Sequence, residues 1–302
     1  MINSYYNNFP FYGKLFIDIS LSQFTTFKIG GKASRLYKPI NIYDLVIFLK
    51  NLSLNEPLLW IGSGSNILIH DNDFLGTVIV TKKCLNNIFL LKNKYVYVEA
   101  GVSCMKLVSF CVKQNFSGIE FLSGIPGTIG GALNMNAGCF NQNIWSFVVS
   151  VEILNRNGIR YIRYPSDFII SYRCITGLKE DEWFISAIFS FSKEKKKKLI
   201  SKIKRFLSYK RKVQPITEYN CGSVFKNPSN DITAGYLIES CNLKGKKIGG
   251  AMISSKHANF IINYNGNASF KDVKKLINII KYTVWKKKSI KLETEVHILD
   301  NK

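Results

Sequence analysis

The feature that most constrains this chain is a glycine-rich segment near its middle. The segment runs from Gly124 to Gly138 and reads GIPGTIGGALNMNAG, with five glycines and one proline. Glycine adopts positive φ and lets a ligand approach the backbone closely, at an entropic cost. Free backbone N–H groups in such a segment form an anion-binding concavity suited to a pyrophosphate. We therefore expect a cofactor-binding loop rather than a structural turn. Its interleaved apolar residues suit a buried, flat cofactor better than a solvated turn: Ile125, Ile129, Ala132 and Leu133.

A second glycine cluster lies upstream, where residues 58–70 read LLWIGSGSNILIH. The pattern predicts a strand, a tight turn and another strand. It is not the GxGxxG motif of a dinucleotide-binding fold, because the third glycine is missing and no helical pattern follows at once. Alone, this run also fits a plain hairpin. Together, the two clusters predict two loops that grip one long phosphate-containing molecule.

Five motif regions then occur in a fixed order along the chain: GSGSN at 62–66, the segment 124–138, CGSVFKNP at 221–228, IGGA at 248–251 with KHA at 256–258, and EVHI at 295–298. In this order and spacing, residues 24–299 resemble the UDP-N-acetylenolpyruvoylglucosamine reductases, flavoenzymes of peptidoglycan precursor synthesis. The resemblance is closest to the shorter subtype, which lacks an extra tyrosine-bearing loop. It implies an FAD-binding fold of the vanillyl-alcohol-oxidase type in two subdomains, followed by a C-terminal α+β substrate-binding domain.

The resemblance also implies the reaction. NADPH, as cosubstrate, would reduce noncovalent FAD, and the enzyme would then reduce UDP-N-acetylglucosamine enolpyruvate to UDP-N-acetylmuramate. Another flavin oxidase or dehydrogenase of the same fold is the alternative, but such an enzyme would not need CGSVFKNP or Glu295. The residues expected to bind FAD are Gly62, Ser63, Gly64, Ser65, Asn66, Gly124, Ile125, Pro126, Gly127, Thr128, Gly130 and Gly131.

Ser223 lies in the CGSVFKNP motif, and a serine after a glycine is ordinarily a turn residue. The resemblance implies that it donates the proton. Hydride addition at C3 of the enolpyruvyl group makes a carbanion-like enolate at C2, basic enough for a hydroxyl held close to protonate it. Cys221 is a rival nucleophile two residues earlier, and we interpret it as structural.

Two charged residues complete the expected catalytic set. Glu295 matches the family's glutamate and is expected to support the protonation step, whereas Glu293 is interpreted as a surface residue. Arg173, in the sequence SYRCI, matches a Tyr-Arg motif, and its guanidinium can pair with the substrate carboxylate and stabilise enolate charge. A surface arginine is the alternative. The chain departs from the family pattern at Thr25, Cys174, Ile175 and His297.

Four further residues match positions that the family places against the substrate. Their ordinary interpretations compete with this one, because Asn before Pro is a common turn signal and an isolated Lys-His pair usually lies on the surface. The four residues are Tyr172, Asn227, Lys256 and His257.

The formal net charge of +22 would ordinarily suggest a nucleic-acid partner. The lysines are spread along the chain beside many Asn and Ile, a pattern that codon bias toward A and T also produces. The densest run, Lys193–Lys198, leads into an amphipathic helical pattern, so we expect a solvated helix face there. No nucleic-acid partner is expected, although a positive field would help to capture anionic ligands.

Composition also bounds the compartment. No apolar run approaches the roughly 20 residues that span a bilayer, so no membrane insertion is expected. Residues 1–10 lack the basic start and apolar stretch of a signal peptide. The seven cysteines are dispersed without a CxxC pair, as in a reduced cytoplasmic protein, and the three separated histidines give no reason to expect a metal site. We expect a monomer or weak oligomer.

The periodicity predicts an α+β protein with three regions, 1–80, 81–208 and 209–302. The resemblance implies that the first two regions hold FAD and that the third binds the substrate. Helices are expected near 41–49 with Asn41 as N-cap, after Ser103, in the basic run after 193, near 233–241, and over 270–285 with Ser269 and Asp272 as a capping pair. Strands are expected at 95–101, 147–154, 183–191, 258–264 and 292–299.

Overall fold

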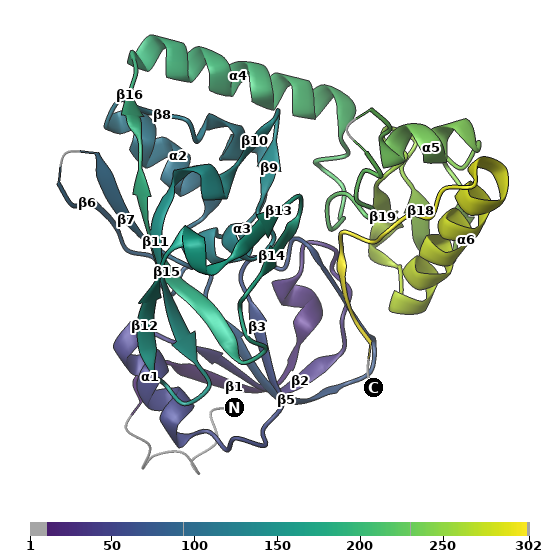
Figure 1. The fold of residues 1–302 in the computed structure, drawn as a ribbon. Coiled ribbons are helices and arrows are strands. Elements are labelled where there is room, and N and C mark those ends of the chain that lie inside the picture. Colours follow the sequence, from purple (N-terminus) through teal and green to yellow (C-terminus); the bar gives the residue numbers. More distant parts are fainter. Residues whose placement is uncertain (1–10, 93, 230, 301–302) are drawn as a thin grey trace. The chain divides into compact units, whose positions relative to one another are not determined.

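The computed structural model describes residues 11–92, 94–229 and 231–300 (Figure 1). The chain divides into two compact units, each built from separate stretches of sequence. The first unit contains residues up to 17, 34–63 and 75–208; the second contains 18–33, 64–74 and 209 onward. Residues 1–10, where we expect no signal peptide, lie outside the described residues. The division into regions 1–80, 81–208 and 209–302 stays a prediction.

Two larger sheets organise the first unit. One is antiparallel, with strand order β12-β11-β15-β7-β6, and the other, mainly in this unit, has the order β1-β2-β5-β3 with β3 parallel to β5. The strands are β1 Lys14–Ser20, β2 Lys32–Lys38, β3 Leu58–Ile61, β5 Phe74–Val80, β6 Ile88–Leu90, β7 Tyr95–Glu99, β11 Val148–Asn155, β12 Arg160–Arg163 and β15 Glu182–Ser190.

The helices of this unit follow their predicted caps. Helix α1, Ile42–Asn51, begins after Asn41, whose side chain accepts a hydrogen bond from the N–H of Asp44 at 2.8 Å. Helix α2, Cys104–Lys113, is capped in the same way by Ser103. Both bury apolar residues at helical spacing, and both predictions are confirmed. Short strands complete the unit: β8 Phe116–Ser117, β9 Gly138–Cys139, β10 Gln142–Asn143, β13 Ile169–Ser171, β14 Cys174–Thr176 and β16 Ser192–Lys193.

The basic run continues into helix α4, Lys196–Val213, as predicted. Its apolar side buries Leu199 and Phe206, and Phe206 stacks on Phe140 with the ring centroids 4.2 Å apart. The lysines of its first turn are exposed. The helix is therefore amphipathic, with an apolar side in the protein and a cationic side in solvent.

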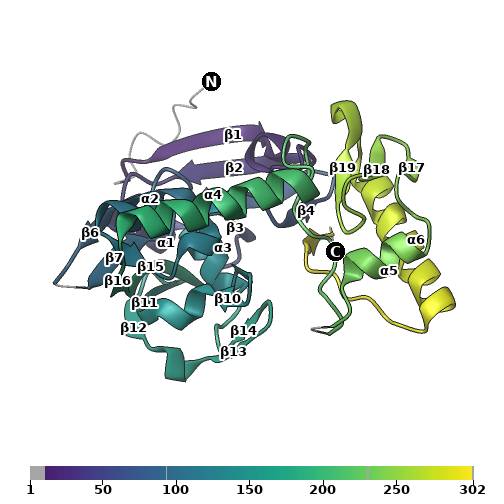
Figure 2. The same cartoon turned by 90° about the horizontal axis from the view of Figure 1, so that it is seen from above.

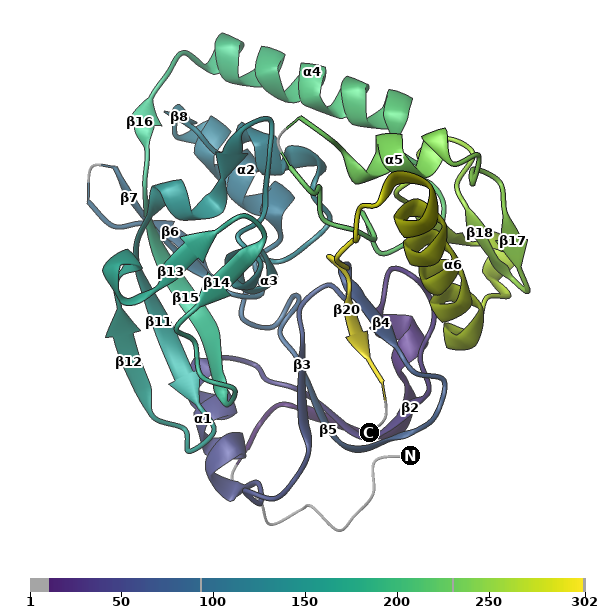
Figure 3. The ribbon, with the colours of Figure 1, turned by 45° about the vertical axis from the view of Figure 1, so that its right-hand side comes forward.

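The second unit contains a three-stranded antiparallel sheet and two helices. Its strands are β17 Lys247–Ile248, β18 Ala251–Ile253 and β19 Ile261–Asn263, and Figure 2 shows them side by side. Helix α6, Phe270–Lys288, packs on this sheet and starts with the predicted capping box of Ser269 and Asp272. Helix α5, Ala234–Ser240, begins after Thr233. A separate parallel pair joins β4 Ile67–Ile69 to β20 His297–Leu299 (Figure 3).

Two predicted strands are shorter than expected. The pattern over 258–264 becomes β19 only from Ile261, because residues 257–260 form a turn closed by the Phe260 N–H and the His257 carbonyl. The pattern over 292–299 becomes β20 only from His297. Alternation predicts exposure, but does not predict which backbone partner a residue finds.

Candidate active site

The glycine-rich segment proves to be partly a packing element. Residues Ile129–Asn134 form helix α3, and its apolar residues Ile129, Ala132 and Leu133 lie in the hydrophobic core of the first unit. The sequence pattern did not predict this helix, in which the i, i+3, i+4 spacing of the three apolar residues gives a buried face. Ile125 also packs, partly buried, against this core.

Gly130 serves this packing. Its N–H donates to the Ala100 carbonyl at 2.9 Å, and an added Cβ would lie only 2.9 Å from the Cβ of Ala100. The N–H of Ile129 is likewise used by the Val102 carbonyl. These two N–H groups are occupied within the protein, which leaves any phosphate contact to other members of the segment.

Thr128 is the member best placed for a ligand. Its side chain is 1% exposed, yet its Oγ1 atom has no hydrogen-bond partner within the described residues. A Cβ built on Gly62 would collide with this oxygen. The first glycine of GSGSN is therefore in close contact with the glycine-rich segment 124–138. The N–H groups of Gly127, Thr128 and Gly131 also donate to no acceptor in the described part of the chain. Buried polar groups without partners are costly, so this arrangement fits an anionic or hydrogen-bonding cofactor.

The GSGSN run is not a hairpin. Strand β3 before it pairs with β5, whereas β4 after it pairs with β20, and the chain passes from the first unit to the second between Ser63 and Gly64. Gly64 has φ +60°, and a Cβ there would meet the Phe24 carbonyl. Within the described residues, the N–H groups of residues 62–65 donate to no acceptor. Such consecutive donors suit a phosphate.

Asn66 has a different contact. Its Nδ2 atom donates to the Glu295 carbonyl at 3.0 Å, and its own carbonyl accepts from the His297 N–H at 3.1 Å. This predicted cofactor residue therefore fixes the backbone of a predicted catalytic residue.

Ser223 lies half-buried beside that backbone, and its hydroxyl makes no hydrogen bond to the residues that the structure describes. The next residue, Val224, donates its N–H to the Asn259 carbonyl at 2.9 Å. The Val224 carbonyl accepts from the N–H of Glu295 at 2.8 Å and of Val296 at 3.4 Å, beside an isolated antiparallel bridge between Phe225 and Thr294. Residues far apart in sequence are thus paired so that Ser223 and Glu295 lie on adjoining segments.

The rival residues behave as interpreted from the sequence. Cys221 is 1% exposed; burial, and then the Glu295 carboxylate, raise the pKa of its thiol to about 12. It therefore stays a neutral thiol and a poor nucleophile at neutral pH. The side chain of Glu293 is 77% exposed and lies 3.4 Å from Lys226 Nζ.

Arg173 and Tyr172 form the two-residue turn of the β13–β14 hairpin. The Arg173 guanidinium donates from Nη2 to the Gly138 carbonyl at 2.7 Å and lies over the Tyr172 ring, 5.1 Å from its centroid. Cys174 and Ile175 therefore do not deprive Arg173 of support, because its partner comes from the end of the glycine-rich segment.

The other predicted substrate residues already have contacts within the second unit. The Asn227 Oδ1 atom accepts from the Ala234 N–H at 3.1 Å, and Lys256 Nζ donates to the Arg211 carbonyl at 2.5 Å. His257 accepts at Nδ1 from the Asn259 N–H, and burial, with a smaller contribution from Lys244, lowers its pKa. These contacts orient the side chains, and their role against a substrate stays a prediction.

Asn259 was missed in the sequence. It lies next to the KHA motif, and its side chain bonds both the N–H and the carbonyl of Phe225, at 3.0 and 2.8 Å. Thr26 was also missed: its hydroxyl donates to the Asn220 carbonyl at 2.6 Å, which links the chain before CGSVFKNP to Gly64 through the Thr26 N–H. For Asn259, the adjacent KHA motif was the only available signal.

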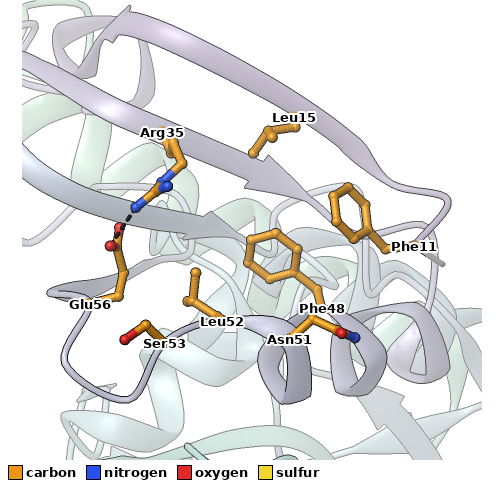
Figure 4. Close-up of a pocket in the computed structure, with 8 residues that line it drawn as sticks. All are labelled: Phe11, Leu15, Arg35, Phe48, Asn51, Leu52, Ser53 and Glu56. Carbon is orange, nitrogen blue, oxygen red and sulfur yellow. Dashed lines mark ion pairs between the residues drawn. The ribbon is translucent and has the colours of Figure 1, made fainter. Parts of the chain in front are cut away.

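Two pockets in the first unit lie away from these residues. Figure 4 shows one of about 130 Å³, between β1, β2 and α1, with an ion pair between Arg35 and Glu56 on its wall. The other is lined by residues at the ends of β11, β12 and β15. Neither contains a predicted site residue. In the described ranges, no three His, Cys, Asp or Glu residues group as a metal site, and no helix has the length and apolar character needed to cross a bilayer.

Known proteins match both halves of the chain. Residues 35–161 match the family model described as "FAD binding domain", and residues 214–299 match "UDP-N-acetylenolpyruvoylglucosamine reductase, C-terminal domain". The reductase of that name from Legionella pneumophila (strain Corby) is 50% identical over 287 residues, which cover 95% of this chain and 92% of the relative. The one from Nitrosococcus oceani is 45% identical over 281 residues, 93% of each chain.

A crystal structure of UDP-N-acetylenolpyruvylglucosamine reductase from Thermus caldophilus superimposes with a TM-score of 0.80 at 27% identity, covering 96% of this chain and 99% of that one. The predicted α+β class with an FAD-binding domain is confirmed. With close relatives over nearly its whole length, this chain belongs to the UDP-N-acetylenolpyruvoylglucosamine reductase family.

Proposed function

We propose that this chain reduces UDP-N-acetylglucosamine enolpyruvate to UDP-N-acetylmuramate, with NADPH as hydride donor and noncovalent FAD as cofactor. The observation that carries the residue assignment is the pairing of the segments around Ser223 and Glu295 through the Val224 carbonyl. When bound, FAD would supply the two-electron chemistry that connects NADPH with C3 of the enolpyruvyl group. The protein's own residues bind, orient and protonate.

Ser223 is the proposed acid. The hydroxyl is half-buried and unpaired within the described residues, while the backbone on its C-terminal side is fixed by Asn259 and Glu295. A hydroxyl held in this way has little freedom to lose when it meets C2 of the substrate. It gives its proton to C2 as the enolate collapses, and an alkoxide remains on the serine until solvent or a neighbour restores the proton.

Glu295 is the proposed partner in this step. Its backbone is held at the N–H by Val224 and at the carbonyl by Asn66. The charge of its carboxylate raises the pKa of the Cys221 thiol, two residues before Ser223. This effect supports a position of the Glu295 carboxylate close to the CGSVFKNP motif. We assign it to orienting Ser223 and stabilising the group that loses the proton.

Arg173 is proposed to pair with the substrate carboxylate, where its charge opposes the negative charge that develops on the enolate. Tyr172, 53% exposed beneath the guanidinium, would contact the same substrate. Asn227, Lys256 and His257 are proposed to bind the UDP-sugar. Because the pKa of His257 is lowered, it would act as a neutral hydrogen-bonding group at neutral pH.

The residues proposed to hold FAD either have donors without an acceptor among the described residues or let a ligand approach the backbone closely. Within the described residues, Thr128 offers a buried hydroxyl without a partner, and Gly127 and Gly131 of the same segment offer unpaired N–H groups. The N–H groups of residues 62–65 suit the pyrophosphate. Pro126 and Gly124 of the same segment stay predicted FAD-binding residues.

The proposal also concerns the positive charge of the protein, its compartment and its oligomeric state. The substrate is an anionic UDP-sugar, so a positive field favours its capture, and no nucleic-acid partner is needed to explain the charge. We propose a cytoplasmic enzyme without membrane insertion that works as a monomer or weak oligomer.

The visible spectrum of the purified protein tests the function. We expect a yellow protein whose flavin absorbance bleaches on addition of NADPH and returns, without oxygen, on addition of the enolpyruvyl substrate. A colourless protein that cannot be reconstituted with FAD would refute the proposal, as would flavin that the substrate does not reoxidise.

A further inference from the structure

The end of the glycine-rich segment holds the turn that carries Arg173. Two hydrogen bonds make this link: Asn136 Nδ2 donates to the Ser171 carbonyl at 2.9 Å, and Arg173 Nη2 donates to the Gly138 carbonyl at 2.7 Å. Ser171 and Cys174 are the paired residues on either side of the two-residue turn. The turn is therefore attached to one short stretch, residues 136–138, at its base and at its tip.

The hairpin needs such an attachment. Strands β13 and β14 have three residues each, and Ser171, Tyr172 and Cys174 are exposed. A two-stranded hairpin of this size is marginally stable on its own. Arg173 also has φ +55°, a conformation that disfavours a long side chain and must be supported by its surroundings.

Asn136 is built for this contact. It is 5% exposed and has φ +43°, a left-handed conformation that asparagine tolerates better than most residues. Its Oδ1 atom is buried without a hydrogen-bond partner within the described residues. An unsatisfied buried acceptor lowers stability, so fold stability alone would favour a less polar side chain here.

We propose that Asn136 is a positioning residue for Arg173: by donating to the Ser171 carbonyl, its amide places the Tyr172–Arg173 turn, and with it the guanidinium, for the substrate carboxylate. The inference rests on the proposed function of Arg173. Asn136 does not itself touch the reacting atoms. Through this contact and the Arg173–Gly138 hydrogen bond, the end of the glycine-rich segment holds the turn that carries the substrate-binding arginine.

The test replaces Asn136 with glycine, which removes the amide and keeps the left-handed backbone without strain. The matched control is Asn141→Gly, since Asn141 is also left-handed, with φ +59°, but is exposed and makes no side-chain hydrogen bond within the described residues. For Asn136→Gly we expect full flavin content, reduction by NADPH within about twofold of the parent, and a KM for the enolpyruvyl substrate raised about five- to tenfold, the range for one lost hydrogen bond. The control should change none of these.

A double-mutant cycle with Arg173→Ala shows whether Asn136 acts through Arg173. In that background, Asn136→Gly should change the KM by less than about twofold, because the group it places is already gone. Full additivity of the two changes would overturn the proposal, and so would loss of flavin or an unchanged KM in Asn136→Gly.

Hydrogen exchange separates this inference from the proposed function. Amides of residues 169–176 should exchange faster in Asn136→Gly than in Asn141→Gly, whether or not the hairpin binds substrate. If Arg173→Ala leaves the substrate step unchanged while exchange rises as expected, the role of Arg173 fails and the link from Asn136 to the turn stands. Unchanged exchange in Asn136→Gly would overturn the link itself.

Discussion

The backbone N–H of Glu295 lies 2.8 Å from the carbonyl oxygen of Val224, the residue that follows Ser223. The Val296 N–H shares the same carbonyl at 3.4 Å. The proposed acid and its carboxylate partner are thus fixed to each other by backbone bonds, which substitutions of either side chain leave in place.

The buried Thr128 hydroxyl gives the first prediction. Thr128→Val keeps the shape and removes a polar atom that has no partner within the described residues, so the apoprotein should be as stable as the parent or slightly more so. FAD affinity should fall about fivefold or more through the lost hydrogen bond. Thr128→Ser, the matched control, should retain the affinity. Thermal unfolding of apoprotein and flavin fluorescence titration measure the two quantities; equal affinity in both variants would remove Thr128 from the cofactor site.

The second prediction concerns the four lysines at 195–198, just before and at the start of helix α4. Replacing residues 195–198 with glutamine should leave turnover within about twofold at physiological salt, where the Debye length is about 8 Å and exposed charges act weakly at a distance. In contrast, Phe206→Ala on the buried side should destabilise the protein by about 3–5 kcal/mol. Steady-state kinetics and denaturant unfolding check the pair. A large loss of turnover in the glutamine variant would assign the cationic face to catalysis.

Cys221 gives a prediction about pH. Burial raises the pKa of its thiol from an ordinary value of 9.0 to about 12. Because the folded-state pKa lies above the unfolded one, the folded form keeps the proton longer, and this contribution to stability is present below pH 9 and lost as the pH rises toward 12. Alkylation at pH 8 should label the exposed Cys174 quickly and Cys221 only after unfolding. Peptide mass spectrometry resolves the two, and equal labelling rates would contradict the assignment of Cys221 as structural.

Glu295→Gln isolates the carboxylate from its backbone. The bonds to Val224 and Asn66 use main-chain atoms of Glu295 and should persist. We expect unchanged flavin reduction by NADPH and slow reoxidation by the enolpyruvyl substrate. The matched control is Glu293→Gln, because Glu293 lies two residues earlier and its side chain is exposed. This control should have no effect on either step. Comparable losses in both variants would show that the segment's charge, rather than Glu295, matters.

Local signals predicted much of the fold. Asn41, Ser103 and Ser269 cap their helices because a short polar side chain before an apolar periodic run satisfies the first free N–H groups. Apolar spacing likewise placed β11 and β15 to within one residue. These features depend on near neighbours in sequence, which a single chain displays.

Long-range pairing could not be predicted. Strands β3 and β4 flank GSGSN as a hairpin would, yet each pairs elsewhere, and nothing in residues 58–70 encodes β5 or β20 as a partner. In the glycine-rich segment, the three apolar residues of α3 were assigned to the cofactor because helical spacing over six residues is too short to recognise. The contacts of Asn136, Asn259 and Thr26 were missed for the same reason, because each joins segments 34 or more residues apart.

The most direct test of the account is stopped-flow absorbance of the two half-reactions in Ser223→Ala. Hydride transfer from NADPH needs no proton from this hydroxyl, so flavin reduction should proceed at the parent rate. Reoxidation by UDP-N-acetylglucosamine enolpyruvate should slow by about 10²–10⁴-fold, the usual effect of losing a positioned general acid. If both half-reactions slow equally, or neither slows, Ser223 is not the proton donor and the assignment of this site is wrong.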